Sequence, residues 1–442
     1  EFMSDTESEG NKMHEKGLAS KIIKAKKKKK QVFMENSVPT LVELAIDVVA
    51  DNITLYPDLN GVYVEHIKEN IIQQCSRDIP VKVAARNIDY EFYWEDCCDA
   101  KIPNCKRENH GNSYKQMFIE KYLEDLLENY KQDPNAKETS DMEKDENLKN
   151  LIQEISACRY DCFSLNITQL LSHLDMSIVF DNLPNLSYLS LTYGAKHVGM
   201  EYDRQRFGMK MQDARIFSEC LRKSHSLVKL ALPCNLIDDE LVNILFKGLM
   251  INKTISQLDL SHNRIGNTGA MKIAKFLAHT QILTHLDLGD NSISYQGSRF
   301  LSQGIANNNS LRVLSLYLNE IDDKGGMKFC QELKGNNKTL LELNLRGNSL
   351  QGEFARALAE LILDTNLTKI DISCNLIKNK KDAIAILDSL KDNPNIIEFD
   401  IRNNKIKDVD VEEEISDVVF QNFINLDKSV KINIHSKEDG KA

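Results

Sequence analysis

One phrase recurs seven times between Leu227 and Ile406, and it constrains the fold more than any other feature of the chain. Each copy has apolar residues at positions 1, 4, 6 and 11 and an asparagine at position 9, as in ISQLDLSHNRI at 255–265. A repeat with near-constant spacing indicates a solenoid, in which each unit contacts mainly its neighbours. The asparagines lie 27 to 29 residues apart, at Asn235, Asn263, Asn291, Asn319, Asn348, Asn375 and Asn404.

The chemistry of each unit predicts how it folds. Apolar alternation, as at Leu258 and Leu260, predicts a short strand with one buried face, and such strands stack into a parallel sheet. The asparagine amide carries donors and an acceptor, which suit it to backbone groups where the chain turns inward. Each unit also has room for a return helix, as at 265–282 and 354–366. We predict an α/β solenoid with concave strands and convex helices, a pattern that resembles the ribonuclease-inhibitor class of leucine-rich repeat.

The solenoid is predicted to occupy residues 151–406. Two degenerate strands, around Phe163 and around Leu189, precede the regular copies and bring the expected number of strands to about nine. The period breaks once, because residues 192–215 are inserted; we predict a loop there that contacts a partner, or else plugs or covers an edge. Residues 407–442 are expected to cap the last repeat, with an acidic turn, a helix and a final apolar alternation.

The region before the solenoid is predicted to contain three parts. Residues 1–36 form a disordered, lysine-rich tail, in which Lys26–Lys30 could contact acidic tubulin tails, another acidic polymer or an anionic membrane, or act in nuclear localisation. Residues 37–131 form a small all-α domain that ends in a helix capped by Ser113 and Gln116. Residues 132–150 form a charged linker that separates the domains. The first helix is expected to bury an apolar face made of Leu41, Leu44, Ala45, Val48 and Val49.

Composition and motifs exclude several classes of function. The net charge of −10 argues against a general nucleic-acid binder. No apolar run approaches the ~20 residues of a membrane helix, and no signal-peptide pattern is present, so we expect an intracellular protein with reduced cysteines. Cys97, Cys98, Cys105 and His110 match no standard zinc spacing. No phosphate-binding or hydrolase motif occurs, so we expect no catalysis, cofactor or metal.

The outward residues of the predicted strands are the candidate binding surface. Stacked carboxylates about 5 Å apart are unfavourable unless a basic group approaches, which favours a basic partner segment. Aspartate at this position can instead form a hydrogen bond within its own repeat, and the sequence does not choose between this interpretation and a basic partner. The candidate partner-binding residues are Asp259, Asp287, Asn344, Asp371 and Asp400 in one column, Tyr317, Arg346 and Arg402 in the next, and Arg204 and Arg206 in the insertion.

Four stretches outside the ladder carry a family resemblance. They read PTLVELAIDVVADNITLYPDLNGV, DIPVKVAARNIDYEFYWEDCC, NHGNSYKQMFIEKYLEDLLENY and LTYGAKHVGMEYDRQRFGM. With the repeats, they make residues 38–406 resemble the dynein regulatory complex subunit 5 family, also called the t-complex-associated testis-expressed family. The resemblance implies a non-catalytic scaffold in the cytoskeleton of the ciliary or flagellar axoneme. Such a subunit binds other subunits of the nexin–dynein regulatory complex, links outer doublet microtubules and helps regulate dynein-driven motility.

Two other functions remain as alternatives. The segment DIPVKVAARNI and the Tyr93–Trp94 pair also resemble the F-box or elongin A type of domain, which implies a leucine-rich-repeat substrate receptor of a ubiquitin ligase. The solenoid class also includes the Ran GTPase-activating protein, which supplies an arginine to the transferring phosphoryl group. Arg204 and Arg206 are the candidates for that role.

Overall fold

The computed structural model describes residues 39–102, 106–130, 146–170, 174–196, 206–406 and 409–439. It divides the chain into two compact units, 1–83 and 84–442. The predicted lysine-rich tail and most of the predicted linker lie outside the described residues. Within the described part, no helix combines the length and apolar character needed to cross a membrane.

The first unit contains helices α2 (Leu41–Asp51) and α3 (Glu65–Gln74). Thr40 caps α2, since its side chain accepts from the Glu43 backbone N–H and the Glu43 carboxylate accepts from the Thr40 N–H. The predicted inner face of α2 was wrong. Ile46 and Ala50 are buried, whereas Leu41 and Val48, on the opposite side of the helix, are 83% and 62% exposed. The helix is apolar on two sides, and among the described helices its main packing partner is α3, which selects the side that is buried.

The second unit begins with a helical region that packs around the single tryptophan. Its elements are α4 (Val81–Asn87, which straddles the unit boundary), α5 (Glu91–Lys101), η1 (Arg107–His110) and α6 (Tyr114–Glu128). Two further helices, α7 (Glu146–Ala157) and α8 (Ser177–Asn182), follow at the start of the solenoid and pack on each other. Trp94 is buried, its ring lies 5.4 Å from that of Phe118, and its indole N–H donates to the Ile88 carbonyl. These aromatic side chains therefore belong to a core.

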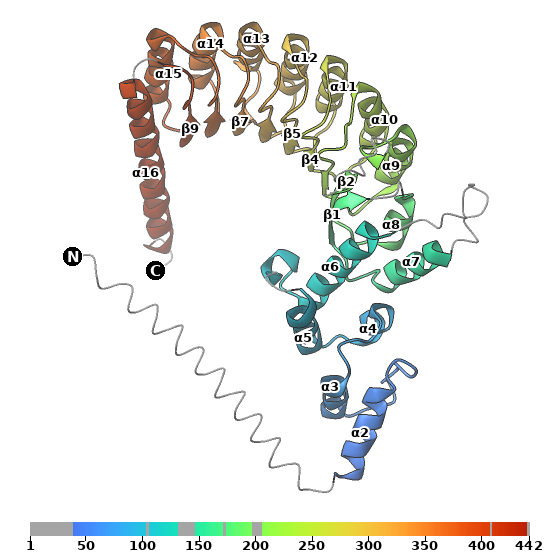
Figure 1. Cartoon of the computed structure of the whole chain (residues 1–442). Coiled ribbons are helices and arrows are strands. Elements are labelled where there is room, and N and C mark those ends of the chain that lie inside the picture. Colours follow the sequence, from blue (N-terminus) through green and yellow to red (C-terminus); the bar gives the residue numbers. More distant parts are fainter. Residues whose placement is uncertain are drawn as a thin grey trace. The chain divides into compact units, whose positions relative to one another are not determined.

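The described residues of the solenoid form one parallel sheet of nine strands in chain order. The strands are β1 (Ser164–Leu170), β2 (Tyr188–Tyr193), β3 (Lys229–Ala231), β4 (Gln257–Asp259), β5 (His285–Asp287), β6 (Val313–Ser315), β7 (Glu342–Asn344), β8 (Lys369–Asp371) and β9 (Glu398–Asp400). The return helices are α9 (Met211–Lys223), α10 (Asp239–Leu249), α11 (Asn267–Leu277), α12 (Tyr295–Ala306), α13 (Asp323–Leu333), α14 (Gly352–Ile362) and α15 (Lys380–Asp392). Figure 1 shows the strands along the inner side of the curve and these helices along the outer side, as predicted.

The ladder asparagines join each repeat to the one before it. The side-chain NH2 of Asn291 donates to the carbonyls of Leu288 (3.0 Å) and Gly289 (3.2 Å) in its own repeat, and of Leu260 (3.1 Å) in the preceding repeat. Its side-chain oxygen accepts from the Ile265 N–H of the preceding repeat (2.9 Å). Buried backbone groups need such partners, so the predicted role of this asparagine is confirmed.

The residue before each ladder asparagine is left-handed. His262, for example, has a φ of 56°, and its N–H donates to the Gly289 carbonyl of the next repeat (2.9 Å). The left-handed turn thus continues the inter-repeat hydrogen bonds beyond the strand. The same position holds Cys234, His262, Asp290, Leu318, Gly347, Cys374 and Asn403, with φ between 50° and 69°.

A second row of asparagines, not predicted from the sequence, follows the return helices. Asn308 is buried; its NH2 donates to the carbonyls of Leu277 and Thr280, and its oxygen accepts from the N–H of Ser310 and Leu311. The row contains Asn252, Asn308, Asn337, Asn366 and Asn393, each of which donates to a carbonyl of the preceding repeat. The repeats are therefore fastened at both ends of the helix.

Asn291→Ala is expected to lower the free energy of unfolding by about 2–5 kcal/mol, because it leaves several buried backbone groups without a partner. The measurement is urea unfolding followed by circular dichroism. Asn307→Ala, at an exposed asparagine in the same repeat, is the control and is expected to change stability by less than about 0.5 kcal/mol. Equal effects of the two substitutions would contradict the role of the ladder.

The open edge of β1 is covered by three glutamates of α6. Glu120 accepts from the N–H groups of Phe163 (2.9 Å) and Ser164 (2.8 Å), Glu124 from that of Asn166 (2.8 Å), and Glu128 from that of Thr168 (2.6 Å). Four residues of helix rise about 6.0 Å and two residues of strand about 6.6 Å, so carboxylates at i, i+4 and i+8 match alternate N–H groups. The helix thus removes an edge that another strand could pair with.

The hydrogen bonds between α6 and β1 explain why the two compact units do not divide at the predicted linker, 132–150. Glu120 is fully buried and also bonds His110 and the Gln116 side-chain NH2, which ties η1 and α6 to the sheet. The division instead lies between Val83 and Ala84. The predicted capping box of Ser113 and Gln116 forms only in part: the Ser113 hydroxyl accepts from the Gln116 backbone N–H, but the Ser113 N–H donates to the His110 carbonyl and the Gln116 side chain bonds Glu120 instead.

Glu124→Ala is expected to cost about 1–3 kcal/mol of stability, because the Asn166 N–H at the edge of β1 loses its acceptor. Glu124→Gln keeps an acceptor oxygen and should cost less. Asp125→Ala, at an exposed position on the same helix, serves as the control. Thermal unfolding of the three variants tests this, and a loss for Asp125→Ala as large as that for Glu124→Ala would disprove it.

Two segments that were predicted to be irregular, the insertion between β2 and β3 and the C-terminal region, are more helical than expected. The insertion was predicted as a loop to residue 215, but α9 begins at Met211, where Asp213 accepts from the Lys210 N–H (2.7 Å) and Phe217 is buried. The C-terminal region is one helix, α16 (Val409–Asp439), so the predicted acidic turn and final alternation were wrong within these residues. Ile415 and its neighbours at four-residue spacing, Val411 and Val419, are buried, which favours a continuous helix.

Candidate partner-binding groove

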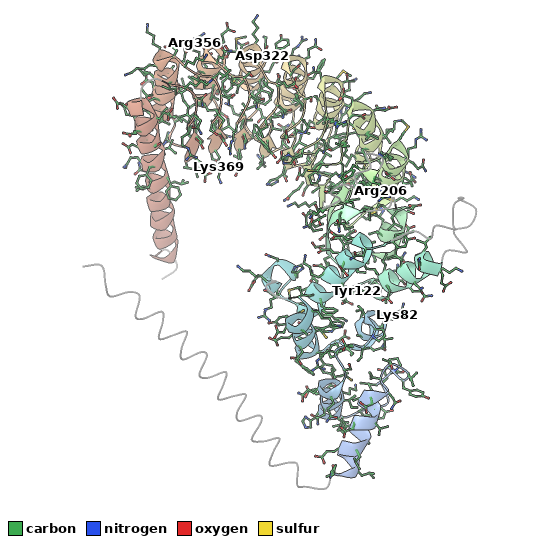
Figure 2. The ribbon with its side chains drawn as sticks, viewed as in Figure 1. Lys82, Tyr122, Arg206, Asp322, Arg356 and Lys369 are labelled. Carbon is green, nitrogen blue, oxygen red and sulfur yellow. The ribbon has the colours of Figure 1, made fainter. Side chains whose placement is uncertain are left out.

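The strand register places the outward side chains in columns. Asp259 pairs with Asp287, and further along Asn344 pairs with Asp371 and Asp371 with Asp400. The predicted carboxylate column is therefore aligned from strand to strand. Figure 2 shows Lys369, the first residue of β8, on the inner side of the curve, while Arg356 lies on the helical side.

Each member of the carboxylate column makes a local turn. One side-chain oxygen accepts from the N–H two residues later: Asp287 from Gly289 (2.8 Å) and Asn344 from Arg346 (2.9 Å). Asp259, Asp371 and Asp400 do the same. Local bonding, the alternative to a basic partner, thus accounts for one oxygen of each residue, and an asparagine can replace the aspartate in this role.

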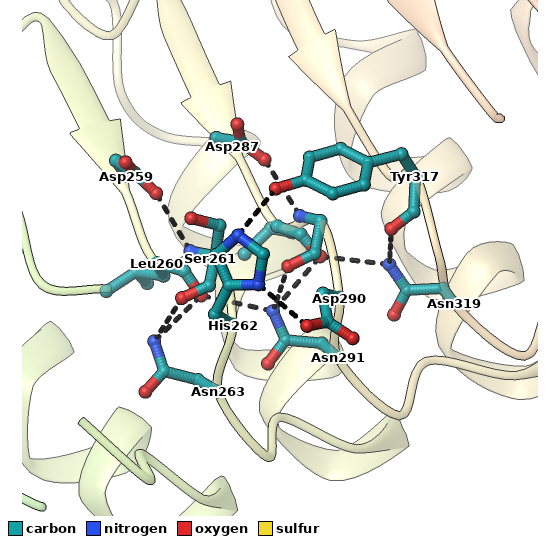
Figure 3. Close-up of polar contacts among 12 residues, drawn as sticks. Asp259, Leu260, Ser261, His262, Asn263, Asp287, Asp290, Asn291, Tyr317 and Asn319 are labelled. Atoms are coloured by element: carbon teal, nitrogen blue, oxygen red, sulfur yellow. Dashed lines mark hydrogen bonds and ion pairs between the residues drawn. The ribbon is translucent and has the colours of Figure 1, made fainter. Parts of the chain in front are cut away.

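Tyr317 joins three repeats on the concave face. Its ring lies over Gly289, where an added Cβ would come within 2.0 Å of it, and its hydroxyl lies 3.1 Å from Nε2 of His262. The other ring nitrogen of His262 lies 2.7 Å from Asp290. Figure 3 shows this chain of contacts beside Asp287. Tyr317 is thus a fixed part of the surface, and a glycine is needed beneath it.

A further column, which was not predicted from the sequence, contains the first residue of each strand from β3 to β9. It points to the same side as the carboxylate column because strand side chains alternate. Lys369 lies 3.7 Å from Glu342 and 3.3 Å from Glu398, and so bridges its neighbours on both sides. The column reads Lys229, Gln257, His285, Val313, Glu342, Lys369 and Glu398. In the sequence, the column can be recognised from Glu342, Lys369 and Glu398, which alternate in charge from one repeat to the next.

These columns form one wall of a groove whose other wall is α16. The groove has a volume of about 870 Å³ and is lined by Asp287 of β5, by strands β6 to β9 and by α16, including Phe420 and Phe423. It brings together Asp287, Tyr317, Asn344, Asp371, Asp400 and Arg402 of the predicted residues. Asp259 and Arg346 lie outside its lining, Arg346 being exposed at the end of β7.

The predicted arginines of the insertion are not part of this groove. Arg206 lies near β2 (Figure 2), four strands from β6, which corresponds to about 19 Å across the sheet. Next to it, the Gly208 N–H donates to the Tyr193 carbonyl and the Met209 N–H to the Asn235 carbonyl, so this end of the insertion is fixed to the sheet. Arg204 lies outside the described residues.

Comparisons with known proteins agree with this architecture. A family model described as Leucine Rich repeat matches residues 252–274, 280–301, 307–330 and 336–359. Dynein regulatory complex subunit 5 of Chlamydomonas reinhardtii is 34% identical over 210 residues, which are 47% of this chain and 51% of that protein. The chain is a leucine-rich-repeat protein related to dynein regulatory complex subunit 5.

Animal proteins of the same name are similar at the same level. Those of Mus musculus and Homo sapiens are each 29% identical over 269 residues, 54% of this chain and 51% of theirs. The chain therefore spans about half the length of the curated relatives it matches. Among solved structures, an internalin of Listeria monocytogenes matches 58% of this chain and 69% of its own, at 18% identity and a TM-score of 0.34. That structural likeness is too weak to add to what the strands and helices show.

Two carboxylates of this leucine-rich-repeat surface have opposite electrostatic environments. Burial raises the pKa of Asp287, and the nearby Asp259 raises it further, against the effect of the Gly289 N–H. A hydrogen bond from the Arg402 side chain lowers the pKa of Asp400. The charged form is thus disfavoured at β5 and favoured at β9.

Asp287→Asn is expected to raise stability at pH 7, because it removes a disfavoured charge and keeps the oxygen that accepts from Gly289. A raised folded-state pKa makes wild-type stability greatest below the unfolded value, about 3.9, and lower as pH rises. The advantage of the variant should therefore shrink as pH falls toward 4. Urea midpoints at several pH values measure it.

Asp400→Asn is the matched control, since it also keeps the turn but removes a favoured charge. It should lower stability at pH 7, and its deficit should shrink as pH falls through the lowered pKa of Asp400. Midpoint shifts of the same sign for both variants at pH 7 would contradict this account of the two sites.

Proposed function

We propose that the chain acts as a non-catalytic structural subunit of a dynein regulatory complex, in the axoneme of a cilium or flagellum. The similarity to dynein regulatory complex subunit 5 carries this proposal, together with the repeat architecture that the family model and the sheet share. In this role the chain holds other subunits of the complex, helps to link outer doublet microtubules and contributes to the control of dynein-driven motility.

The physical properties of the solenoid support a scaffold role. The two rows of asparagines and the left-handed residues fasten each repeat to the next, so the concave face is held in a defined shape. Such a face offers an extended surface for protein contacts without a catalytic pocket. Its side chains combine charged columns with an aromatic residue, Tyr317, fixed across three repeats.

The lysine-rich segment is proposed as a second contact, with tubulin. Lys26–Lys30 carry five adjacent positive charges, which suit the acidic tails of tubulin. This part of the proposal rests on charge alone.

Purification of the tagged chain from ciliated cells tests the proposed function. We expect the other dynein regulatory complex subunits to copurify and the chain to stay with axonemes after a salt wash. A tagged ciliary protein from outside the complex, expressed at the same level, is the control. Recovery of a cullin and its adaptor in place of these subunits would overturn the proposal in favour of a ubiquitin-ligase receptor.

A further inference from the structure

Helix α16 presents two different apolar faces, and only one of them packs on the solenoid. Val411, Ile415 and Val419 are buried where the helix contacts α15 and β9. Farther along, the Asn422 side chain donates to the Ile396 carbonyl (3.1 Å) and fixes the helix to the last repeat. The attachment of α16 therefore does not depend on its other apolar residues.

The second apolar face of α16 is open and points into the groove. Phe420 and Phe423, three residues apart and therefore adjacent on the helix, are 59% and 52% exposed, and both line the cavity. Two half-exposed phenylalanines beside each other on a fixed helix are an unfavourable use of apolar surface unless a partner covers them.

The wall opposite these phenylalanines is acidic. The groove contains two basic residues, Lys369 and Arg402, and both already pair with carboxylates of the same surface. The strand side therefore faces the phenylalanines with a surplus of three negative charges, and Glu412 of α16 adds a fourth to the lining. The six acidic residues of the lining are Asp287, Glu342, Asp371, Glu398, Asp400 and Glu412.

We propose that this groove binds an amphipathic α-helix of a partner protein, with its apolar face on Phe420 and Phe423 and its lysines and arginines toward the acidic strands. A helix fits because helices pack 8–10 Å apart through residues at three- and four-residue spacing, the spacing that α16 presents. An added strand does not fit, since β6 to β8 are paired on both sides and β9, the last strand, is in contact with α16. The inference goes beyond membership of a complex, because it assigns the surface and the chemistry of its partner.

A second copy of the chain is a poorer occupant of the groove. The first turns of α16 carry four acidic residues, Asp410, Glu412, Glu413 and Glu414. Two copies that met through this helix would bring these charges close to the acidic strands of the groove. Like charges at such distances repel, so a basic helix is favoured.

The test uses the full chain and a synthetic, fluorescein-labelled helical peptide of about 22 residues, with leucines on one face and lysines on the other. Fluorescence anisotropy should show saturable binding that weakens as salt rises. Two comparison peptides separate the causes: one has the same composition with the leucines distributed around the helix, and one has glutamates in place of the lysines. Both are expected to bind at least tenfold more weakly.

Two variants of the chain complete the test. Phe420→Ser combined with Phe423→Ser should weaken binding of the amphipathic peptide at least tenfold, with an unchanged melting curve because both side chains are exposed. Met250→Ser combined with Ile251→Ser removes two equally exposed apolar residues that follow α10 (50% and 56% exposed), and should change the affinity less than twofold.

Three outcomes would overturn the inference: equal binding of the distributed-leucine peptide, equal binding by the Phe420/Phe423 variant, or self-association of the chain that this variant abolishes. The last would identify a second copy as the occupant. None of these outcomes bears on copurification from cilia, so failure here and failure of the proposed function can be told apart.

Discussion

The asparagine amide at position 9 is the interaction on which the solenoid depends. At that point the chain leaves the sheet and turns toward its helix, and the backbone groups of the turn are buried. A single side chain satisfies three carbonyls and one N–H, and two of these four groups belong to the preceding repeat. The same amide therefore closes its own turn and fixes the distance to its neighbour. Because every repeat is tied in this way, side chains from strands far apart in the sequence keep a constant register.

A stacked sheet must end somewhere, and this chain ends it in two different ways. At β1, Glu120, Glu124 and Glu128 accept hydrogen bonds from the backbone, so the edge is closed by polar contacts. At β9, the closure comes from α16, whose buried residues are apolar. The glutamates of α6 fit one register of β1, whereas α16 covers β9 with one side and leaves apolar side chains on its other side exposed. That difference is the reason the groove lies at the C-terminal end.

Much of the fold could be predicted from the sequence, because the repeat supplies many independent copies of one signal. The strands, the helices at 265–282 and 354–366 and the role of the ladder asparagine follow from apolar spacing and amide chemistry. The inner face of α2 did not follow, since both sides of that helix are apolar and only the tertiary neighbours select one. The edge-covering role of the α6 glutamates did not follow either, because their partners lie about 40 residues away in sequence.

The candidate site was predictable only in part. The columns of outward residues follow from strand alternation, and the register keeps them aligned. The groove itself did not follow, because it requires α16 to lie opposite β6 to β9, which no local pattern in the sequence specifies. The column from Lys229 to Glu398 was overlooked since its members share neither charge nor size.

The left-handed residue that precedes each ladder asparagine has a consequence for how the repeats vary. Six of its seven occurrences are not glycine, although this conformation costs an ordinary side chain about 1–2 kcal/mol. The backbone there is held by hydrogen bonds on both sides, so the identity of the side chain does not decide the path of the chain. These side chains form a rim that can change from cysteine to histidine, aspartate or leucine while the scaffold keeps its shape. Diversity in recognition can therefore accumulate along this rim at a known and limited cost in stability.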